Sequence, residues 1–188
     1  MYDTPYFYKK IETDVPKNSS DILYKCFKHD KYFSNQFHWW NKKRKMKKMF
    51  DESISICLKY GTVYGYWDSS ELVGLSLVFD FNKLRNEDEE LLKKIFQTSN
   101  KNKSTLYDCC LKQFIPEDSD CVYFLCIGIL PEYQKLGFGS KLVSAIKKDY
   151  DGYDIFTDVS NEFLSSHLIR KHDFYILGWF SGCTILKY

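Results

Sequence analysis

The sequence has no apolar run long enough to cross a membrane, and its first residues lack the basic and apolar pattern of a secretory signal. Its seven cysteines include no Cys-x-x-Cys pair and no Cys/His cluster at zinc spacing. Its formal net charge of +2 gives no strong field toward nucleic acid or a membrane surface. We therefore expect a cytoplasmic protein with free thiols, without a metal, and without a nucleic-acid or membrane partner.

The composition is otherwise that of an ordinary soluble globular protein, with 44% hydrophobic and 28% charged residues. A length of 188 residues suits one domain with a full core, and we expect residues 1–188 to form it. Aromatic residues make up 18% of the chain, which is enough to line a cleft, although rings fill cores more often.

The most informative stretch joins an apolar run, 125–130, to an amphipathic run near Leu142. Between them lie Pro131 and a short polar turn with two glycines, Gly137 and Gly139. This order predicts a strand, a tight loop and a helix. The first turn of a helix leaves about four N–H groups without partners, and glycines let an anion approach the backbone. The loop is therefore predicted to hold a pyrophosphate at these residues: Gln134, Lys135, Leu136, Gly137, Phe138, Gly139 and Ser140.

Two common nucleotide-binding loops do not fit this stretch. The dinucleotide pattern needs a third glycine where Leu142 stands, and the nucleoside-triphosphate loop with its Gly-Lys pair is absent. What matches is Gln134-x-x-Gly137-x-Gly139, with Pro131 three residues ahead of the glutamine. This pattern resembles the coenzyme A-binding motif Gln/Arg-x-x-Gly-x-Gly/Ala of the GNAT superfamily of N-acetyltransferases. The alternative is a strand–helix turn that uses its glycines only for geometry.

The resemblance covers the chain from about residue 62 to 188. It implies a mixed α/β fold, GNAT-like, with a central twisted mixed sheet flanked by helices. β-rich runs predict strands over 6–11, 62–67, 72–79, 121–129 and 154–159, and a closing hairpin over 174–180 and 183–187. Helical spacing predicts helices over 20–27, 42–61, 140–148 and 161–171. Two further helical patterns predict a helical insertion, 82–116, before the cofactor strand.

The stretch 42–48 contains six basic side chains. A nucleic-acid patch is one interpretation. However, Met46, Phe50 and Ile54 recur through it at helical spacing, which favours the solvated face of an amphipathic helix.

The resemblance also implies a reaction, which is direct acetyl transfer from acetyl-CoA to the amine of a small molecule or peptide. Two parallel strands would splay near Ile129 and admit the pantetheine arm, which would pair with the backbone of Ile127 and Ile129. The Ile129 N–H would donate to the thioester oxygen. Asn161 would bond the pantetheine, or would only cap the next helix. A homodimer is a further expectation from the family.

The catalytic residues of the family match less well. Its tyrosine general acid falls at Ile169 here, and Asp173 replaces a glycine. Tyr123 on the cofactor strand, with Asp120 upstream, is a candidate for the proton-accepting region, and His167 is a candidate to protonate the thiolate or is only a solvated helix residue. These departures leave a second interpretation open, a catalytically weak or inactive GNAT-fold module that binds coenzyme A and regulates.

Overall fold

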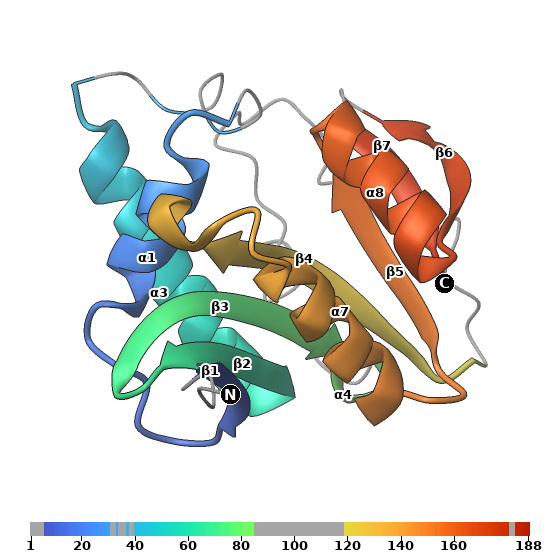
Figure 1. The fold of residues 1–188 in the computed structure, drawn as a ribbon, viewed down its shortest axis with the longest axis horizontal. Helices are drawn as coiled ribbons and strands as arrows, with labels where there is room; N and C mark the ends of the chain where they lie inside the picture. Colours follow the sequence, from blue (N-terminus) through green and yellow to red (C-terminus); the bar gives the residue numbers. More distant parts are fainter. Residues whose placement is uncertain (1–5, 31–32, 34–36, 38–39, 85–118, 181–182) are drawn as a thin grey trace.

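The computed structural model describes residues 6–30, 33, 37, 40–84, 119–180 and 183–188, which form one mixed sheet flanked by helices (Figure 1). Seven strands follow the order β1-β2-β3-β4-β5-β7-β6, and β4 and β5 pair in parallel at its centre. The strands are β1 (Tyr6–Ile11), β2 (Gly61–Asp68), β3 (Glu71–Asp80), β4 (Cys121–Ile129), β5 (Asp154–Val159), β6 (Tyr175–Phe180) and β7 (Cys183–Lys187). The helices are α1 (Ser19–Phe27), α3 (Lys42–Tyr60), α4 (Phe81–Leu84), the 3-10 turn η2 (Pro131–Tyr133), α7 (Phe138–Asp149) and α8 (Glu162–His172).

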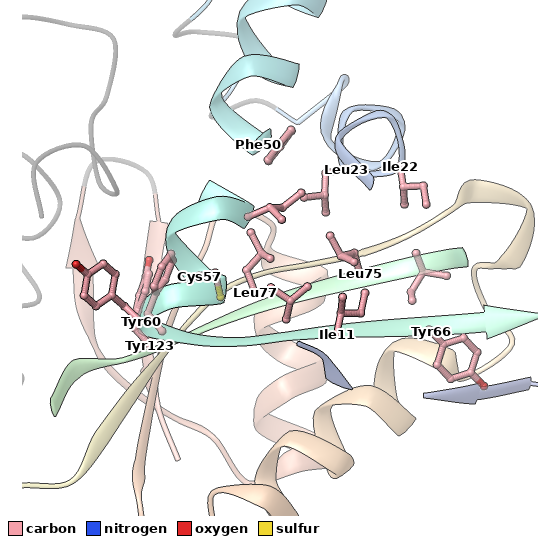
Figure 2. Packing of buried hydrophobic residues seen from close by; sticks show 14 of the residues in the cluster. Ile11, Ile22, Leu23, Phe50, Cys57, Tyr60, Tyr66, Leu75, Leu77 and Tyr123 are labelled. Atoms are coloured by element: carbon pink, nitrogen blue, oxygen red, sulfur yellow. The ribbon is translucent and has the colours of Figure 1, made fainter. Parts of the chain in front are cut away.

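The core lies on both faces of the sheet. On one face, Leu23 of α1 and Phe50 of α3 belong to a cluster with Leu75 of β3 (Figure 2). On the other face, Leu142 of α7 and Leu168 of α8 belong to a second cluster with the central strands. Burial on both faces explains why the central strands are almost continuously apolar in sequence.

The helix α3 carries the basic stretch 42–48 on its outer side. Met46 and Phe50 are buried, whereas Lys47 extends to Asp21 of α1, with 2.8 Å between Nζ and Oδ2. The interpretation of this stretch as the polar face of an amphipathic helix is confirmed.

The predicted strands agree with the structure. Those at 6–11, 121–129 and 154–159 have the predicted bounds, and the hairpin of β2 and β3 is slightly longer than predicted. The closing hairpin also forms, and its second strand pairs with β5, so that β7 lies between β5 and β6. The mixed, helix-flanked sheet predicted from the sequence is therefore confirmed.

The predicted starts of two helices were wrong. The helix α7 begins at Phe138, ahead of the predicted Ser140, because Gly137 adopts a left-handed conformation (φ 81°) and serves as the N-cap. The helix α1 begins at Ser19, ahead of the predicted Ser20, because the Ser19 N–H donates to the Pro16 carbonyl and the turn has already started there.

Most of the predicted helical insertion, 82–116, lies outside the described residues. Residues 82–84 belong to the short helix α4, which follows β3 directly. The insertion and the single domain over residues 1–188 stay predictions.

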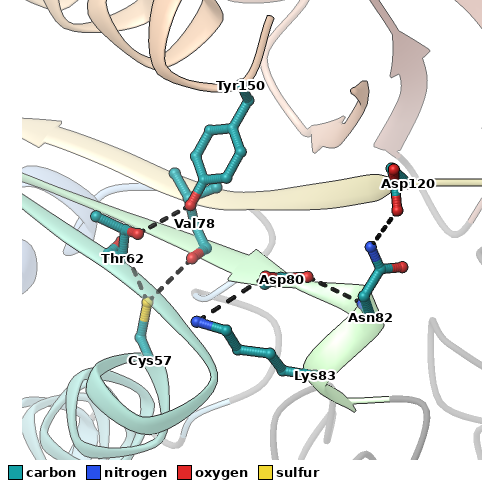
Figure 3. A network of polar contacts seen from close by, with 8 residues as sticks. All are labelled: Cys57, Thr62, Val78, Asp80, Asn82, Lys83, Asp120 and Tyr150. Carbon is teal, nitrogen blue, oxygen red and sulfur yellow. Dashed lines mark hydrogen bonds and ion pairs between the residues drawn. The ribbon is translucent and has the colours of Figure 1, made fainter. Parts of the chain in front are cut away.

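Polar contacts fix the C-terminal end of α7 to the sheet (Figure 3). The Tyr150 hydroxyl, just after α7, lies 2.8 Å from Thr62 Oγ1 of β2. The Tyr64 hydroxyl donates to Asp149 over 2.9 Å. These bonds hold the helix at the end opposite its glycine-rich start.

One substitution tests the close contact between α3, β2 and β3. A Cβ added at Gly61 would lie 2.1 Å from the Val78 carbonyl oxygen, and a backbone atom cannot move aside cheaply. We expect Gly61→Ala to lower the free energy of unfolding by about 1–3 kcal/mol or more, measured by denaturant titration. The matched control is Gly139→Ala, since nothing lies within 4 Å of a Cβ there. Equal stability of the two variants would contradict the packing described.

Candidate functional site

The central strands β4 and β5 pair only over part of their length. Their register runs from Cys121 opposite Asp154 to Phe124 opposite Thr157. Beyond that pair, β4 continues to Ile129 without pairing to β5 (Figure 1). The two strands thus diverge from Phe124 onward, earlier along β4 than the predicted splay near Ile129.

The backbone of β4 turns hydrogen-bonding groups toward this divergence. The Leu130 N–H donates to the Val73 carbonyl over 2.9 Å, on the β3 side. Backbone groups alternate along a strand, so the N–H groups of Ile129 and Ile127 face the opposite edge, where β5 has separated. The Ile129 carbonyl accepts from Gln134 Nε2 over 2.8 Å. The N–H groups of Ile127 and Ile129 are therefore the backbone donors of β4 that point into the divergence.

A β-bulge lies where the strands begin to separate. Val78 of β3 lies opposite Phe124 and Leu77 lies opposite Cys126, so Leu125 is the extra residue. On the other edge, Thr157 Oγ1 donates to the Phe124 carbonyl over 2.9 Å. A bulge bends its strand and locally increases the twist, which gives the divergence a local structural cause.

The glycine loop, residues 134–140, follows β4 and η2 and leads into α7. Lys135 (φ 64°) and Gly137 (φ 81°) both adopt positive φ, which folds the chain back toward the helix start. The Lys141 N–H makes a helical bond to the Gly137 carbonyl (3.0 Å), so the N–H groups before it have no acceptor within the helix. Nothing lies within 4 Å of a Cβ built at Gly137 or Gly139. The loop therefore has the free amides and the open space that an anion such as a diphosphate requires.

An aromatic cluster packs the glycine loop against strands β1 and β2. The ring of Phe138, the first residue of α7, lies 4.6 Å from the Tyr6 ring of β1 and 4.7 Å from the Tyr66 ring of β2. Tyr133 also packs against Tyr6, and its hydroxyl donates to Asp68 over 3.2 Å. These contacts join the loop to strands distant in sequence, which sequence patterns alone did not reveal.

Asn161 caps the helix after β5. Its side-chain oxygen accepts from the N–H groups of Phe163 (2.9 Å) and Leu164 (3.2 Å). This is the helix-cap role that the sequence left open. The amide nitrogen of Asn161 takes no part in these two bonds, so it can still donate to a ligand.

His167 belongs to α8 and lies against the start of α7. Its Nε2 lies 2.8 Å from the Ser140 hydroxyl, so α8 brings it to the glycine loop. The buried His172 follows on the same helix, with 5.7 Å between the two ring centres. Burial lowers the pKa of His172 below its usual 6.5, and the neighbouring His167 and Lys147 lower it further.

Tyr123 is fully buried beneath the divergence, and its hydroxyl donates to the carboxylate of Asp158. Asp120 directly precedes β4, and its carboxylate accepts a hydrogen bond from the Asn82 side chain over 2.7 Å (Figure 3). Tyr123 and Asp120, which the sequence analysis grouped, therefore have different hydrogen-bond partners. The partner of Tyr123 is Asp158, which no sequence pattern had indicated.

The carboxylate of Asp158 lies in an unusual setting. Burial raises the pKa of Asp158, while hydrogen bonds from Tyr123 and Cys183 act in the opposite direction. Thiols near the divergence are also affected by burial, which raises the pKa of Cys26 to about 12 and that of Cys126 still higher. A thiolate nucleophile is therefore disfavoured at this site.

The tyrosine position of the GNAT family holds Ile169, which packs against the core beneath α8. Asp173 takes the left-handed conformation (φ 60°) that ends this helix, a conformation that a glycine adopts most easily. The replacement of the family glycine by Asp173 therefore leaves the backbone path intact.

No protein-family model matches the chain, and no curated relative matches it. Solved structures do match the chain. A histone acetyltransferase HPA2 and related acetyltransferase from Corynebacterium glutamicum matches with TM-score 0.69 and 15% identity, over 97% of this chain and 94% of that one. A mosquito arylalkylamine N-acetyltransferase-like protein matches with TM-score 0.59 and 12% identity, over 97% and 99%. A GNAT family acetyltransferase from Elizabethkingia anophelis with bound acetyl-CoA matches with TM-score 0.54 and 12% identity, over 97% of both chains.

The chain therefore has the fold of the GNAT acetyltransferases, as its glycine loop had suggested. Within the described residues, no three His, Cys, Asp or Glu side chains gather as a metal site, and no helix is long and apolar enough to cross a membrane. The cytoplasmic location and the homodimer stay predictions.

The buried His172 predicts a pH dependence of stability. Because its pKa is lower in the folded state, the unfolded chain binds more protons as the pH falls below about 6.5. Stability is therefore complete above this pH and decreases below it. We expect His172→Phe to flatten this decrease, measured as the free energy of unfolding between pH 7.5 and 5.5. An unchanged slope in the variant would contradict this assignment.

Proposed function

We propose that this protein is an N-acetyltransferase that moves the acetyl group of acetyl-CoA directly to an acceptor amine. The observation that carries the proposal is the early end of β4–β5 pairing directly ahead of an anion-binding glycine loop. One end of this site suits a diphosphate and the other exposes strand backbone, which together match the two ends of coenzyme A.

The pyrophosphate would lie against the glycine loop. The N–H groups of Gly139 and Ser140 stand at the positive end of α7, which favours an anion. Lys135 adds a positive charge close by. His167, through its contact with Ser140, would support the phosphates, and this position is more consistent with coenzyme binding than with protonation of the sulfur.

The pantetheine arm would lie in the divergence. Its amides can pair with the free edge of β4 at Ile127 and Ile129 in the manner of an added strand. Asn161 stands at the end of β5, across from this edge, with its amide nitrogen available to the arm. The Ile129 N–H would donate to the thioester oxygen and stabilise the charge that develops there.

Transfer would be direct. The acceptor nitrogen attacks the thioester carbon, and the sulfur of coenzyme A leaves. An intermediate on Cys126 is disfavoured, since burial keeps that thiol protonated. A solved neighbour named as arylalkylamine N-acetyltransferase-like supports an amine acceptor, and another with bound acetyl-CoA supports the acetyl donor.

A second candidate function is a module that binds coenzyme A without transferring acetyl. The observation that favours it is Ile169, a partly buried apolar residue that packs against the core at the family's tyrosine position. The two functions differ in one assay, the release of coenzyme A thiol from acetyl-CoA on addition of amines. We expect wild-type protein to release thiol faster with 2-phenylethylamine, spermidine or a pentapeptide with a free amino terminus. Tight coenzyme binding without amine-dependent release would favour the binding module.

The glycine loop gives a matched pair of variants. Gly139→Glu places bulk and negative charge where the diphosphate would lie, so we expect coenzyme A affinity to fall at least about tenfold. Gly139→Ala meets no protein atom, and the family motif allows alanine at this position, so we expect stability near that of wild type and a much smaller loss of affinity than for Gly139→Glu. Isothermal titration measures the affinity, and thermal unfolding confirms that both variants fold. Equal affinity of the two variants would show that the phosphates bind elsewhere.

His167→Gln distinguishes the two roles of this histidine. If His167 supports the phosphates, the variant should bind acetyl-CoA about three- to tenfold more weakly with little change in kcat, as expected for loss of a hydrogen bond near a charged group. A large fall in kcat with unchanged coenzyme affinity would instead assign it to protonation of the thiolate. Steady-state kinetics with acetyl-CoA as the varied substrate separate these outcomes.

A further inference from the structure

Asp158 is the first residue of β5 beyond its pairing with β4. The ladder ends at Phe124 and Thr157, so the next backbone unit of β5 already borders the divergence. On its other edge, β5 remains paired to β7, with Asp158 opposite Ile185. At Asp158, β5 is therefore paired with β7 on one edge and unpaired with β4 on the other.

The side chain of Asp158 lies on the face of the sheet that α1 and α3 cover. Ile185, directly across from it, belongs to the core on that face, and so do Phe156 and Tyr123. The glycine loop leads into α7 on the opposite face. A thioester that reaches through the divergence would therefore meet Asp158 on the side away from the phosphates.

Asp158 is held by neighbours from two strands. The Tyr123 hydroxyl of β4 and the Cys183 thiol of β7 both donate to its carboxylate. Asp158 is only partly exposed as a residue, and it directly follows the last residue of β5 that pairs with β4. Burial nevertheless raises the pKa of Asp158, which brings it closer to the range useful for proton transfer near neutral pH.

We propose that Asp158 accepts the proton of the acceptor ammonium, and that Tyr123 positions its carboxylate for this step. The inference rests on the proposed acetyl transfer and assigns the proton acceptor that the transfer needs. Tyr123 itself cannot take this role while its hydroxyl donates to Asp158. Tyr123 is therefore a positioning residue and Asp158 the catalytic one.

The proposed steps balance in protons and electrons. The ammonium gives one proton to Asp158, which leaves a neutral amine. Its lone pair forms the C–N bond to the thioester carbon, and the carbonyl π pair moves to oxygen, beside the Ile129 N–H. An electron pair on that oxygen then re-forms the C=O bond as the C–S bond breaks, and sulfur leaves with the electrons of the C–S bond. A second nitrogen proton neutralises the thiolate, and Asp158 returns its proton to water.

Other titratable groups surround this carboxylate on the same face. Asp30, which follows α1, interacts with it repulsively and accepts from the Ser160 hydroxyl over 2.7 Å. The Cys126 thiol on β4 also interacts with Asp158, and burial raises its pKa, so it stays protonated. The repulsion from Asp30 raises the affinity of Asp158 for a proton, and the two carboxylates favour the approach of a cationic amine.

The test compares two acceptors that differ in protonation. At pH 7.5 an alkylamine such as 2-phenylethylamine is an ammonium ion, whereas hydroxylamine is largely neutral and needs no base before attack. We expect Asp158→Asn to lower kcat/KM for the alkylamine about 10²- to 10⁴-fold. Transfer to hydroxylamine should fall less than about tenfold, and coenzyme A affinity should stay within twofold of wild type.

Two further variants complete the test. Tyr123→Phe removes a hydrogen bond that lowers the pKa of Asp158, so the acid limb of the pH profile should move to higher pH while the enzyme stays active. Asp154→Asn, on the same strand but paired with Lys187 over 2.8 Å, is the control and should keep the wild-type rates.

The outcomes are distinct. Full alkylamine transfer by Asp158→Asn, or an equal loss with both acceptors, would overturn the role of Asp158. Absence of transfer by the wild-type protein to any of these amines would overturn the proposed function, and the proton acceptor with it.

Discussion

The loss of hydrogen bonding between β4 and β5 is the constraint on which the rest of the site depends. Two parallel strands inside a sheet normally satisfy each other's backbone groups, and buried groups without partners are costly. Here the ladder ends at Phe124 and Thr157, with a bulge at Leu125 and a side-chain bond from Thr157 at the point of separation. Local contacts thus account for the edge of β4 that does not pair with β5, and a ligand with its own amides can form hydrogen bonds to that edge.

The two faces of the sheet divide the chemistry. The side of α7 offers helix amides, Lys135 and His167, which suit an anion. The side of α1 and α3 offers Asp158 and Asp30, which suit a cation. The substrate with phosphates and the substrate with an ammonium would therefore approach from opposite faces and meet where β4 and β5 separate. This arrangement would keep each substrate away from the other's binding groups and would orient the transfer.

Sequence reasoning predicted the strand, the glycine loop and the helix after it because their features are local. A strand, two glycines and an amphipathic helix lie within about twenty residues, and each has its own periodicity or turn residue. The start of α7 was misplaced because only the backbone shows that Gly137, through its left-handed conformation, begins the helix. The pair of Tyr123 and Asp158 could not be found, since it depends on the register of two strands 35 positions apart. The bulge at Leu125 likewise depends on how β3 and β4 align, which no residue in that apolar run indicates.

The buried thiols of Cys26 and Cys126 have one more consequence. Acetyl-CoA is an electrophile, and a nearby thiolate would take the acetyl group onto the protein itself. Because burial raises the pKa of both cysteines far above neutral, these sulfurs remain unreactive beside an activated ester. The protein would in this way be chemically inert toward the proposed acetyl donor, and the acetyl group would be preserved until an amine arrives.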